Sequence, residues 1–200
     1  MSTAEMVDHD RRRFLTTSAT VVGGVGVAFA AVPFLASWAP SERAQAAGAP
    51  VEIDISRLEP GARIVVEWRG RPVWVINRTE DMLATLPELV GELRDPQSNE
   101  SQQPPYTQNL VRARDAMPHM FVAIGICTHL GCSPQYRPEI APADLGPNWK
   151  GGFFCACHGS RYDLAGRVYR GVPAPTNLVI PPYKFLSDTR ILVGDDSEAA

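Results

Sequence analysis

The stretch ICTHLGC, residues 126–132, and its counterpart FCACHGS, residues 154–160, contain all four cysteines and two of the four histidines of the chain. We call them cysteine segments I and II. Each follows an apolar run, MFVAIGI at 120–126 and GGFFC at 151–155, and such a run predicts a buried strand. Two strands would thus deliver two loops, each presenting one thiol and one imidazole, which together can hold a metal.

The spacing is Cys127-x-His129 in segment I and Cys155-x-x-His158 in segment II, and each segment has a further cysteine. Two disulfides in an exported domain would use the cysteines and leave the histidines unexplained. A Cys₂His₂ zinc site is possible, although zinc fingers usually place the two cysteines in one loop and the two histidines in the other. The mixed spacing favours a [2Fe–2S] cluster with two cysteines on one iron and two histidines on the other.

The N-terminus predicts a membrane anchor. Residues 14–41 carry no charge, and the apolar part at 16–38 exceeds the roughly 20 residues that cross a bilayer. Arg11 and Arg12, followed by Phe14 and Leu15, fit a twin-arginine export signal, which serves passengers that fold before export. The arginines precede the apolar run, so the N-terminus is expected in the cytoplasm and the rest outside.

Four parts are expected along the chain: a leader with the twin-arginine signal at 1–15, a transmembrane anchor at 16–40, a flexible neck at 41–50 and a soluble domain at 51–200. The neck, SERAQAAGAP, contains no bulky apolar residue. The sequence AQAAG at 44–48 could be a cleavage site, but the length of the apolar run favours an uncleaved anchor.

The soluble part is expected to be all-β, built from small antiparallel sheets. Residues 63–79, RIVVEWRGRPVWVINRT, contain two β-rich runs joined at Arg69-Gly70-Arg71, which predicts a hairpin. Short strands are also expected in GRVYRG, LVIPPYKFL and RILVG, at 166–171, 178–186 and 190–194. Three tryptophans, Trp68, Trp74 and Trp149, are interpreted as core residues. The charged stretch 92–95 is interpreted as a solvated loop.

Bulk composition narrows the class of protein. The hydrophobic fraction of 44% and charged fraction of 20% over 200 residues are typical of a globular chain. The 18 prolines and 16 glycines indicate a loop-rich fold and argue against a helical bundle. A net charge of −3 gives no sign of nucleic-acid binding.

The pattern CTHLGC followed by CACHGS and a tyrosine resembles the Rieske iron–sulfur proteins of cytochrome bc1 complexes, most closely the bacterial subunits. The resemblance covers most of the chain, including the twin-arginine anchor, the neck, WRGRPVWVINRT and DLAGRVY. Three positions depart from the usual family pattern: Ala156 stands where proline is common, Arg161 where histidine or glutamine is common, and Val172 follows Gly171 where proline is common. None of them is an expected ligand.

The resemblance implies a role for each site residue. One [2Fe–2S] cluster would be bound by Cys127 and Cys155 on the inner iron and by His129 and His158 on the outer iron. The two histidines are the residues that would take part in catalysis. The remaining expected site residues are a disulfide between Cys132 and Cys157, hydrogen-bond donors to the cluster sulfurs at Ser160 and Tyr162, the docking residue Leu130, and a cluster-shielding proline loop that includes Gly171, Pro173, Ala174 and Pro175.

The resemblance also implies an activity and partners. The chain would be a subunit of a quinol–cytochrome c reductase that passes one electron from ubiquinol, at cytochrome b, to cytochrome c1. His158 would accept a hydrogen bond and a proton from the quinol, and the soluble domain would swing on its neck. The expected location is the bacterial inner membrane, with a single-pass anchor, a periplasmic domain and a dimeric complex.

Two alternatives stay open from the sequence. One is the Rieske subunit of another periplasmic oxidoreductase, such as the small subunit of arsenite oxidase. The other is a membrane-anchored binding module that is stabilised by zinc or disulfides and has no redox role. Rieske ferredoxins and ring-hydroxylating oxygenases fit less well, because they lack the extra cysteine pair and the anchor.

Overall fold

The computed structural model describes residues 8–42, 44 and 48–197, and it divides into two compact units, residues 1–46 and 47–200. The expected leader lies partly outside the described residues, and so does the expected neck at 41–50. In the first unit, Asp8 accepts hydrogen bonds from the backbone N–H groups of Asp10 and Arg11 and so caps helix α1, His9–Ala36. The cap and the long apolar run together explain why a single helix forms here.

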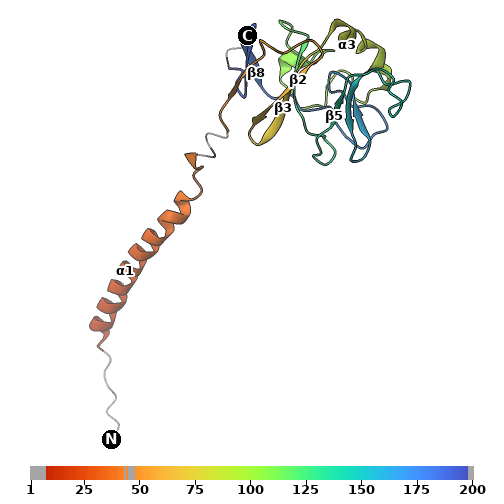
Figure 1. The fold of residues 1–200 in the computed structure, drawn as a ribbon. Helices are drawn as coiled ribbons and strands as arrows, with labels where there is room; N and C mark the ends of the chain where they lie inside the picture. Colours follow the sequence, from red (N-terminus) through yellow and green to blue (C-terminus); the bar gives the residue numbers. More distant parts are fainter. Residues whose placement is uncertain (1–7, 43, 45–47, 198–200) are drawn as a thin grey trace. The chain divides into compact units, whose positions relative to one another are not determined.

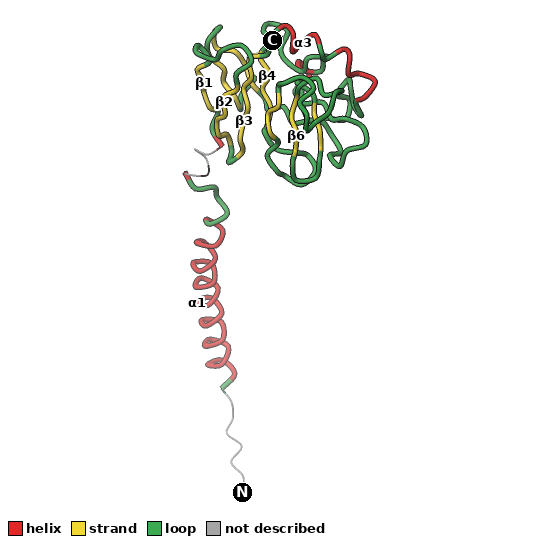
Figure 2. Tube along the Cα trace, turned by 45° about the vertical axis from the view of Figure 1, so that its right-hand side comes forward, coloured by secondary structure: helices red, strands yellow, loops and turns green. Residues whose placement is uncertain are grey.

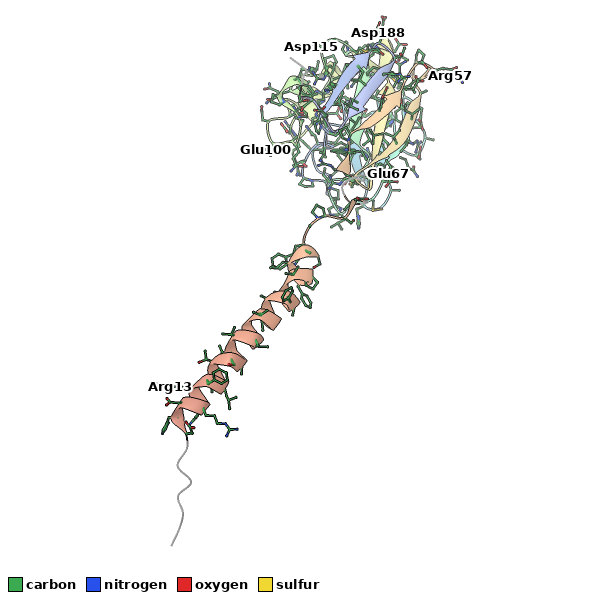
Figure 3. All side chains as sticks on the ribbon, turned by 90° about the vertical axis from the view of Figure 1, so that its left-hand side faces the viewer. Arg13, Arg57, Glu67, Glu100, Asp115 and Asp188 are labelled. Atoms are coloured by element: carbon green, nitrogen blue, oxygen red, sulfur yellow. A yellow bond between two sulfur atoms is a disulfide. The ribbon has the colours of Figure 1, made fainter. Side chains whose placement is uncertain are left out.

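No side chain of helix α1 is buried within the described residues, and an 18-residue stretch of the helix has a mean hydropathy of 2.0, which suits a membrane span. Figure 3 shows these side chains directed outward from the helix. The part of the helix from Phe14 onward is uncharged and has apolar groups on every side, so it needs a surrounding of lipid or of other helices. This matches the predicted anchor.

The second unit is built from three antiparallel sheets of three strands each (Figure 1). The first sheet has the order β1-β9-β8 and contains Val51–Asp54, Arg190–Val193 and Tyr183–Ser187. The second has the order β2-β3-β4 and contains Arg63–Trp68, Arg71–Asn77 and Met120–Ile124. The third has the order β5-β6-β7 and contains Gln135–Arg137, Gly152–Cys155 and Ser160–Tyr162.

Only short helices interrupt the strands of this unit among the described residues: α3, Glu80–Ala84, and the 3₁₀ helices η1, Pro87–Glu92, and η2, Pro105–Thr107. Much of the remaining chain is loop, as the green tube in Figure 2 shows. The predicted all-β class with small antiparallel sheets is therefore confirmed.

The predicted hairpin at residues 63–79 is confirmed as β2 and β3. Its turn is shorter than expected: Trp68 pairs with Arg71, so only Arg69 and Gly70 lie between the strands. Both have positive φ, 53° and 69°, as in the two-residue turn whose twist matches that of a hairpin.

The short strands predicted at residues 166–171 and 178–186 were partly wrong. Residues 166–171 form only isolated bridges, Tyr162 with Val168 and Leu93 with Tyr169, rather than a strand. In the next segment, β8 begins only at Tyr183. Pro181 and Pro182 precede it, and proline has no N–H to donate to a sheet.

One core joins the three sheets. It includes Ile191 from the first sheet, Val75 and Phe121 from the second, and Phe153 from the third. Trp74 stacks on Phe153 with ring centroids 5.0 Å apart. The three tryptophans predicted to be core residues are all buried.

The interpretation of residues 92–95 as a solvated loop was wrong for Asp95, which is buried. Its carboxylate accepts hydrogen bonds from Asn99 N, Glu100 N and Ser101 Oγ. These bonds organise the next loop and offset the cost of removing the carboxylate from water. Charged residues such as Arg57, Glu67 and Asp188 do lie at the periphery of this unit (Figure 3).

Candidate metal centre

The two cysteine segments form turns with the same backbone hydrogen bond. In segment I, Gly131 N donates to Cys127 O at 3.0 Å, and in segment II, Gly159 N donates to Cys155 O at 2.9 Å. Gly131 and Gly159 have φ of +86° and +79°, a conformation that side chains other than glycine disfavour. Each turn therefore begins at a cysteine and closes four residues later.

Strands deliver both turns. Segment I follows β4 through Gly125. A Cβ atom added to Gly125 would lie 2.2 Å from the indole of Trp74, so only glycine fits here. Segment II connects β6 to β7, with Cys155 paired to Ser160. The predicted strand leading into segment I ends at Ile124, because the tight approach of Gly125 to Trp74 redirects the chain.

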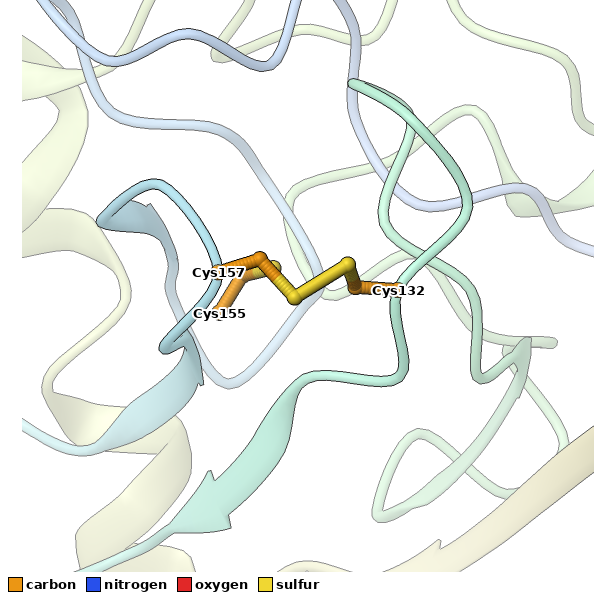
Figure 4. Close-up of side chains that lie close together, drawn as sticks. All are labelled: Cys132, Cys155 and Cys157. Carbon is orange, nitrogen blue, oxygen red and sulfur yellow. A yellow bond between two sulfur atoms is a disulfide. The ribbon is translucent and has the colours of Figure 1, made fainter.

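A disulfide joins the two segments, as the resemblance implied, between Cys132 and Cys157. Figure 4 shows Cys155 beside it, and the sulfurs of these three cysteines lie within 4.8 Å of one another. Since two of these sulfurs are bonded to each other, the three cysteines are not a metal-ligand set. The bond instead holds segment I against segment II next to the Cys155 thiol.

The free thiols and the imidazoles take different positions. Cys127 and Cys155 are free and buried. His129 is half-buried and His158 is exposed, and their ring centroids are 4.8 Å apart. Each segment therefore contributes one buried sulfur and one imidazole that is more exposed than the sulfur. The donor set fits a metal centre of two thiolates and two imidazoles.

The thiols need a cation to act as ligands. Burial raises the pKa of the Cys155 thiol, and the neighbouring Cys127 thiol raises it further. A buried thiolate pair is therefore disfavoured without compensating positive charge. Metal binding supplies that charge and releases the thiol protons.

The Tyr162 hydroxyl lies against the Cys127 sulfur. Tyr162 is fully buried, and its Oη lies 3.2 Å from Cys127 Sγ. The same oxygen accepts a hydrogen bond from Thr128 N at 3.1 Å, which leaves its own proton for the sulfur or for Thr128 Oγ1. Burial, followed by the effect of Cys127, raises the pKa of Tyr162, so the phenol stays a donor at neutral pH.

The 171–175 segment is hydrogen-bonded to segment II through Ala174. Ala174 N donates to the fully buried Ser160 Oγ at 3.1 Å, so the Ser160 proton is free for another acceptor. Thr128 Oγ1 donates to Thr176 O at 2.7 Å and ties this segment to segment I. The expected proline loop is thus beside both cysteine segments.

Two contributors were missed from the sequence. Thr128 lies between Cys127 and His129, and its position inside segment I was the signal that could have drawn attention to it. Thr176 acts through its backbone carbonyl, which no side-chain pattern reveals. Leu130, the expected docking residue, is 72% exposed beside His129.

Two family models match the chain. Residues 90–184 match the family model described as the Rieske [2Fe-2S] domain. Residues 1–41 match the model described as the ubiquitinol-cytochrome C reductase Fe-S subunit TAT signal.

Two curated relatives align along nearly the whole chain. The ubiquinol-cytochrome c reductase iron-sulfur subunit of Allochromatium vinosum is 58% identical over 98% of this chain and 94% of its own length. The subunit of the same name from Bradyrhizobium diazoefficiens is 42% identical over 97% of this chain and 100% of its own length. Among solved structures, a chain of a hyperthermophilic respiratory Complex III is 28% identical and covers 90% of this chain and 98% of its own, with a TM-score of 0.47.

Proposed function

The chain belongs to the family of ubiquinol-cytochrome c reductase iron-sulfur subunits, and on that premise we propose that it carries one electron from ubiquinol at cytochrome b to cytochrome c1. The observation that carries the proposal is the donor set: two buried thiols and two outward imidazoles, given pairwise by two loops that a disulfide joins. In the enzyme, this subunit would contribute to catalysis through its metal centre.

Four residues would hold the [2Fe–2S] cluster: Cys127, His129, Cys155 and His158. When bound, the cluster supplies one-electron redox chemistry, at a potential of about −150 to +300 mV for this ligand type. Neutral imidazoles in place of two thiolates leave the site less negative, which is why such sites are easier to reduce than all-cysteine sites.

The exposed imidazole of His158 would meet the substrate. The ring nitrogen that does not bind iron would accept a hydrogen bond from the quinol hydroxyl and then its proton, which requires that this nitrogen be deprotonated beforehand. His129, half-buried beside it, holds its ring edge-on to the His158 ring with planes at 89°.

Other side chains would tune and shield the centre. Tyr162 would donate its phenol proton toward a Cys127 thiolate, and Ser160 has a proton free for a cluster sulfide. Such hydrogen bonds withdraw electron density and favour the reduced form. The segment from Gly171 to Pro175 excludes water, and Leu130 offers an exposed apolar contact for cytochrome b.

The four expected parts of the chain fit this role. Residues 1–15 would direct twin-arginine export, residues 16–40 would anchor the chain in the inner membrane, and residues 41–50 would form the neck. The domain at 51–200 would lie in the periplasm and move on that neck between cytochrome b and cytochrome c1, in a dimeric complex. Protons taken from the quinol would leave on the periplasmic side.

Electron paramagnetic resonance of ascorbate-reduced membranes tests the proposal. The wild-type chain should give a rhombic signal with a low average g value, and Cys127→Ser and His158→Gln should abolish it. His119→Gln is the matched control, because His119 is a half-buried histidine outside the cysteine segments, and it should keep the signal. A wild-type protein that contains zinc and lacks the signal would establish the non-redox alternative instead.

A further inference from the structure

Three arginines of the soluble domain are almost completely buried: Arg78, Arg112 and Arg167. Arg78 follows β3, Arg112 lies in the loop before β4, and Arg167 follows β7. Asp163, also buried, is the carboxylate paired with Arg167, at 2.6 Å. A buried cation is costly unless fixed acceptors satisfy its N–H groups. The acceptors of each guanidinium group therefore identify the parts of the chain that it binds.

The acceptors converge on one turn, residues 163–167. Arg78 Nη1 donates to Leu164 O at 3.2 Å. Arg112 Nη1 donates to Ala165 O at 3.0 Å and to Gly166 O at 3.2 Å. Both side chains come from parts of the sequence more than 50 residues earlier, so they hold the turn from outside.

The turn has no backbone carbonyl without a partner. The three middle carbonyls accept from the two arginines, as described above, and Gly166 O also accepts from Leu178 N. The end carbonyls are satisfied within the turn, Asp163 O by Gly166 N and Arg167 O by Asp163 N. The two external guanidinium groups therefore supply partners to three of the five backbone carbonyls of the turn.

The other bonds of these arginines fix them to the rest of the domain. Arg78 also donates to Val111 O at 2.8 Å and Pro118 O at 2.6 Å. Arg112 also donates to Gln103 Oε1 at 2.8 Å and Leu178 O at 2.8 Å. The turn is thus tied to the chain that precedes β4 and to the chain that follows the proline loop.

The same turn continues directly from Tyr162. It connects β7 to the bridge between Tyr162 and Val168, so it fixes the backbone from which the Tyr162 side chain extends. The Tyr162 hydroxyl lies 3.2 Å from Cys127 Sγ, a distance at which a small displacement decides whether a hydrogen bond forms.

We propose that Arg78 and Arg112 are positioning residues for the metal centre: they hold the 163–167 turn and thereby keep the Tyr162 hydroxyl in hydrogen-bonding contact with the Cys127 sulfur. The inference rests on the proposed function, since the hydrogen bond acts on a ligand sulfur. It assigns a role in setting the redox potential to two side chains that touch neither the expected ligands nor the solvent.

Lysine should not replace Arg112 in this role. The planar guanidinium donates in several fixed directions, whereas lysine places its donors on a single nitrogen. Four acceptors, on Gln103, Ala165, Gly166 and Leu178, surround the guanidinium. Arg112→Lys therefore loses much of the support of the turn.

The test is a redox titration of the resonance signal in membranes that contain the full complex. Arg112→Lys should shift the midpoint potential downward, because a weakened hydrogen bond to the ligand sulfur favours the oxidised form. The same substitution in a Tyr162→Phe background should give a much smaller shift. An equal shift in both backgrounds would overturn the proposal, since the arginine would then act independently of Tyr162.

A milder variant and a second readout cover the case in which Arg112→Lys does not fold. Gln103→Met removes one acceptor of Arg112 and should give a smaller shift in the same direction. Amide hydrogen exchange of residues 163–167 should become faster in both variants. Arg190→Lys, an exposed arginine of β9, is the matched control and should change neither measurement.

The outcomes separate the two proposals. Absence of the resonance signal from the wild-type chain would contradict the proposed function itself. A normal signal with an unshifted potential in Arg112→Lys and Gln103→Met would contradict only the positioning role.

Discussion

At the scale of single residues, two kinds of glycine shape the metal centre for different physical reasons. Gly159 has a positive φ, and a Cβ placed there would meet no atom within 4 Å. A Cβ on Gly125 would overlap the Trp74 indole at 2.2 Å. The first glycine is required by backbone conformation alone, and the second by close packing.

We expect Gly159→Ala to cost about 1–2 kcal/mol of unfolding free energy, the usual penalty for a left-handed alanine. Gly125→Ala should cost about 3 kcal/mol or more, because the rigid indole must move and its stacking on Phe153 is disturbed. Denaturant unfolding of the two variants checks the order. Equal costs would contradict the close packing of Gly125 against Trp74.

Tyr169 provides a residue-scale prediction in the opposite direction. Its ring stacks on Trp149, and its buried hydroxyl has no hydrogen-bond partner among the described residues. Tyr169→Phe keeps the stacking and removes an unsatisfied polar group, so unfolding free energy should rise by about 1 kcal/mol. A thermal or denaturant melt measures this. A loss of stability would show that the hydroxyl is hydrogen-bonded in solution.

The sequence pattern indicated the candidate ligands Cys127, His129, Cys155 and His158 more readily than the residues that position them. Cysteine and histidine are uncommon and chemically specific, so four positions at fixed spacing already indicate a metal site. The surroundings depend on long-range contacts. Thr128 reaches Thr176 across 48 residues, and Arg112 reaches Gly166 across 54. No local pattern encodes those pairs.

At the scale of elements, the disulfide between the two cysteine segments links turns that no strand pairs directly. Cys132 and Cys157 are 25 residues apart, and closing a loop of that length stabilises the folded state by about 3 kcal/mol. Without it, segments I and II are held together only by side-chain contacts and by whatever metal they share.

Cys132→Ser should therefore lower stability by about 3 kcal/mol and speed the loss of the cluster to a chelator. It should also lower the midpoint potential, since the loops shield the sulfurs less well. Cys157→Ser and the double variant should behave like the single one, because each removes the same bond. Unchanged retention of the cluster in all three would show that the metal alone holds the segments together.

Local sequence signals determined which strands were predicted correctly. The β2–β3 hairpin has a turn signal and a β-rich run on each side, and β4 is apolar throughout. Residues 166–171 also have β-favouring side chains, but buried arginine and asparagine side chains take several of their backbone groups. Val168 N, for example, donates to Asn177 Oδ1 at 2.8 Å. Tertiary hydrogen bonds there replaced a sheet.

At the scale of the whole molecule, the two units use apolar side chains differently. Valines of the soluble domain mostly fill its core, whereas Val25 of α1 is 52% exposed with no core to enter. Composition was sufficient to predict the helical anchor, because a long uncharged stretch can satisfy its backbone in lipid only as a helix. The arrangement of three small sheets could not be read in this way.

Val25→Arg should weaken the anchor. A charge near the centre of a spanning helix costs about 2.5–3.5 kcal/mol on insertion, so the carbonate-resistant membrane fraction should fall. Val65→Arg is a closely matched control, because Val65 of β2 is 53% exposed in the soluble domain. It should stay with the membrane like the wild type. Equal retention of both variants would contradict a spanning role for α1.

The five tyrosines give the last prediction for the whole domain. Burial raises the pKa of every one of them, and that of Tyr183 rises to about 12. Between pH 10 and these raised values, the unfolded chain has lost phenol protons that the native chain retains. The tyrosine contribution to stability is therefore present below pH 10 and is lost as the pH rises through the native pKa values.

Stability alone would not isolate this effect, because burial lowers the pKa of Arg78 to about 10 and that of Arg112 to about 9, and lowered pKa values act in the opposite direction. The direct measurement is the ¹³Cζ chemical shift of labelled tyrosines during a titration of the full chain in detergent. At pH 10.5, where an unfolded chain is mostly phenolate, the native resonances of Tyr162, Tyr169 and Tyr183 should still be those of the neutral phenol. Tyr162 lies beside the Cys127 sulfur, Tyr169 stacks on Trp149, and Tyr183 begins strand β8. A phenolate appearing at pH 10 on one of these three residues would show that its site is open to water.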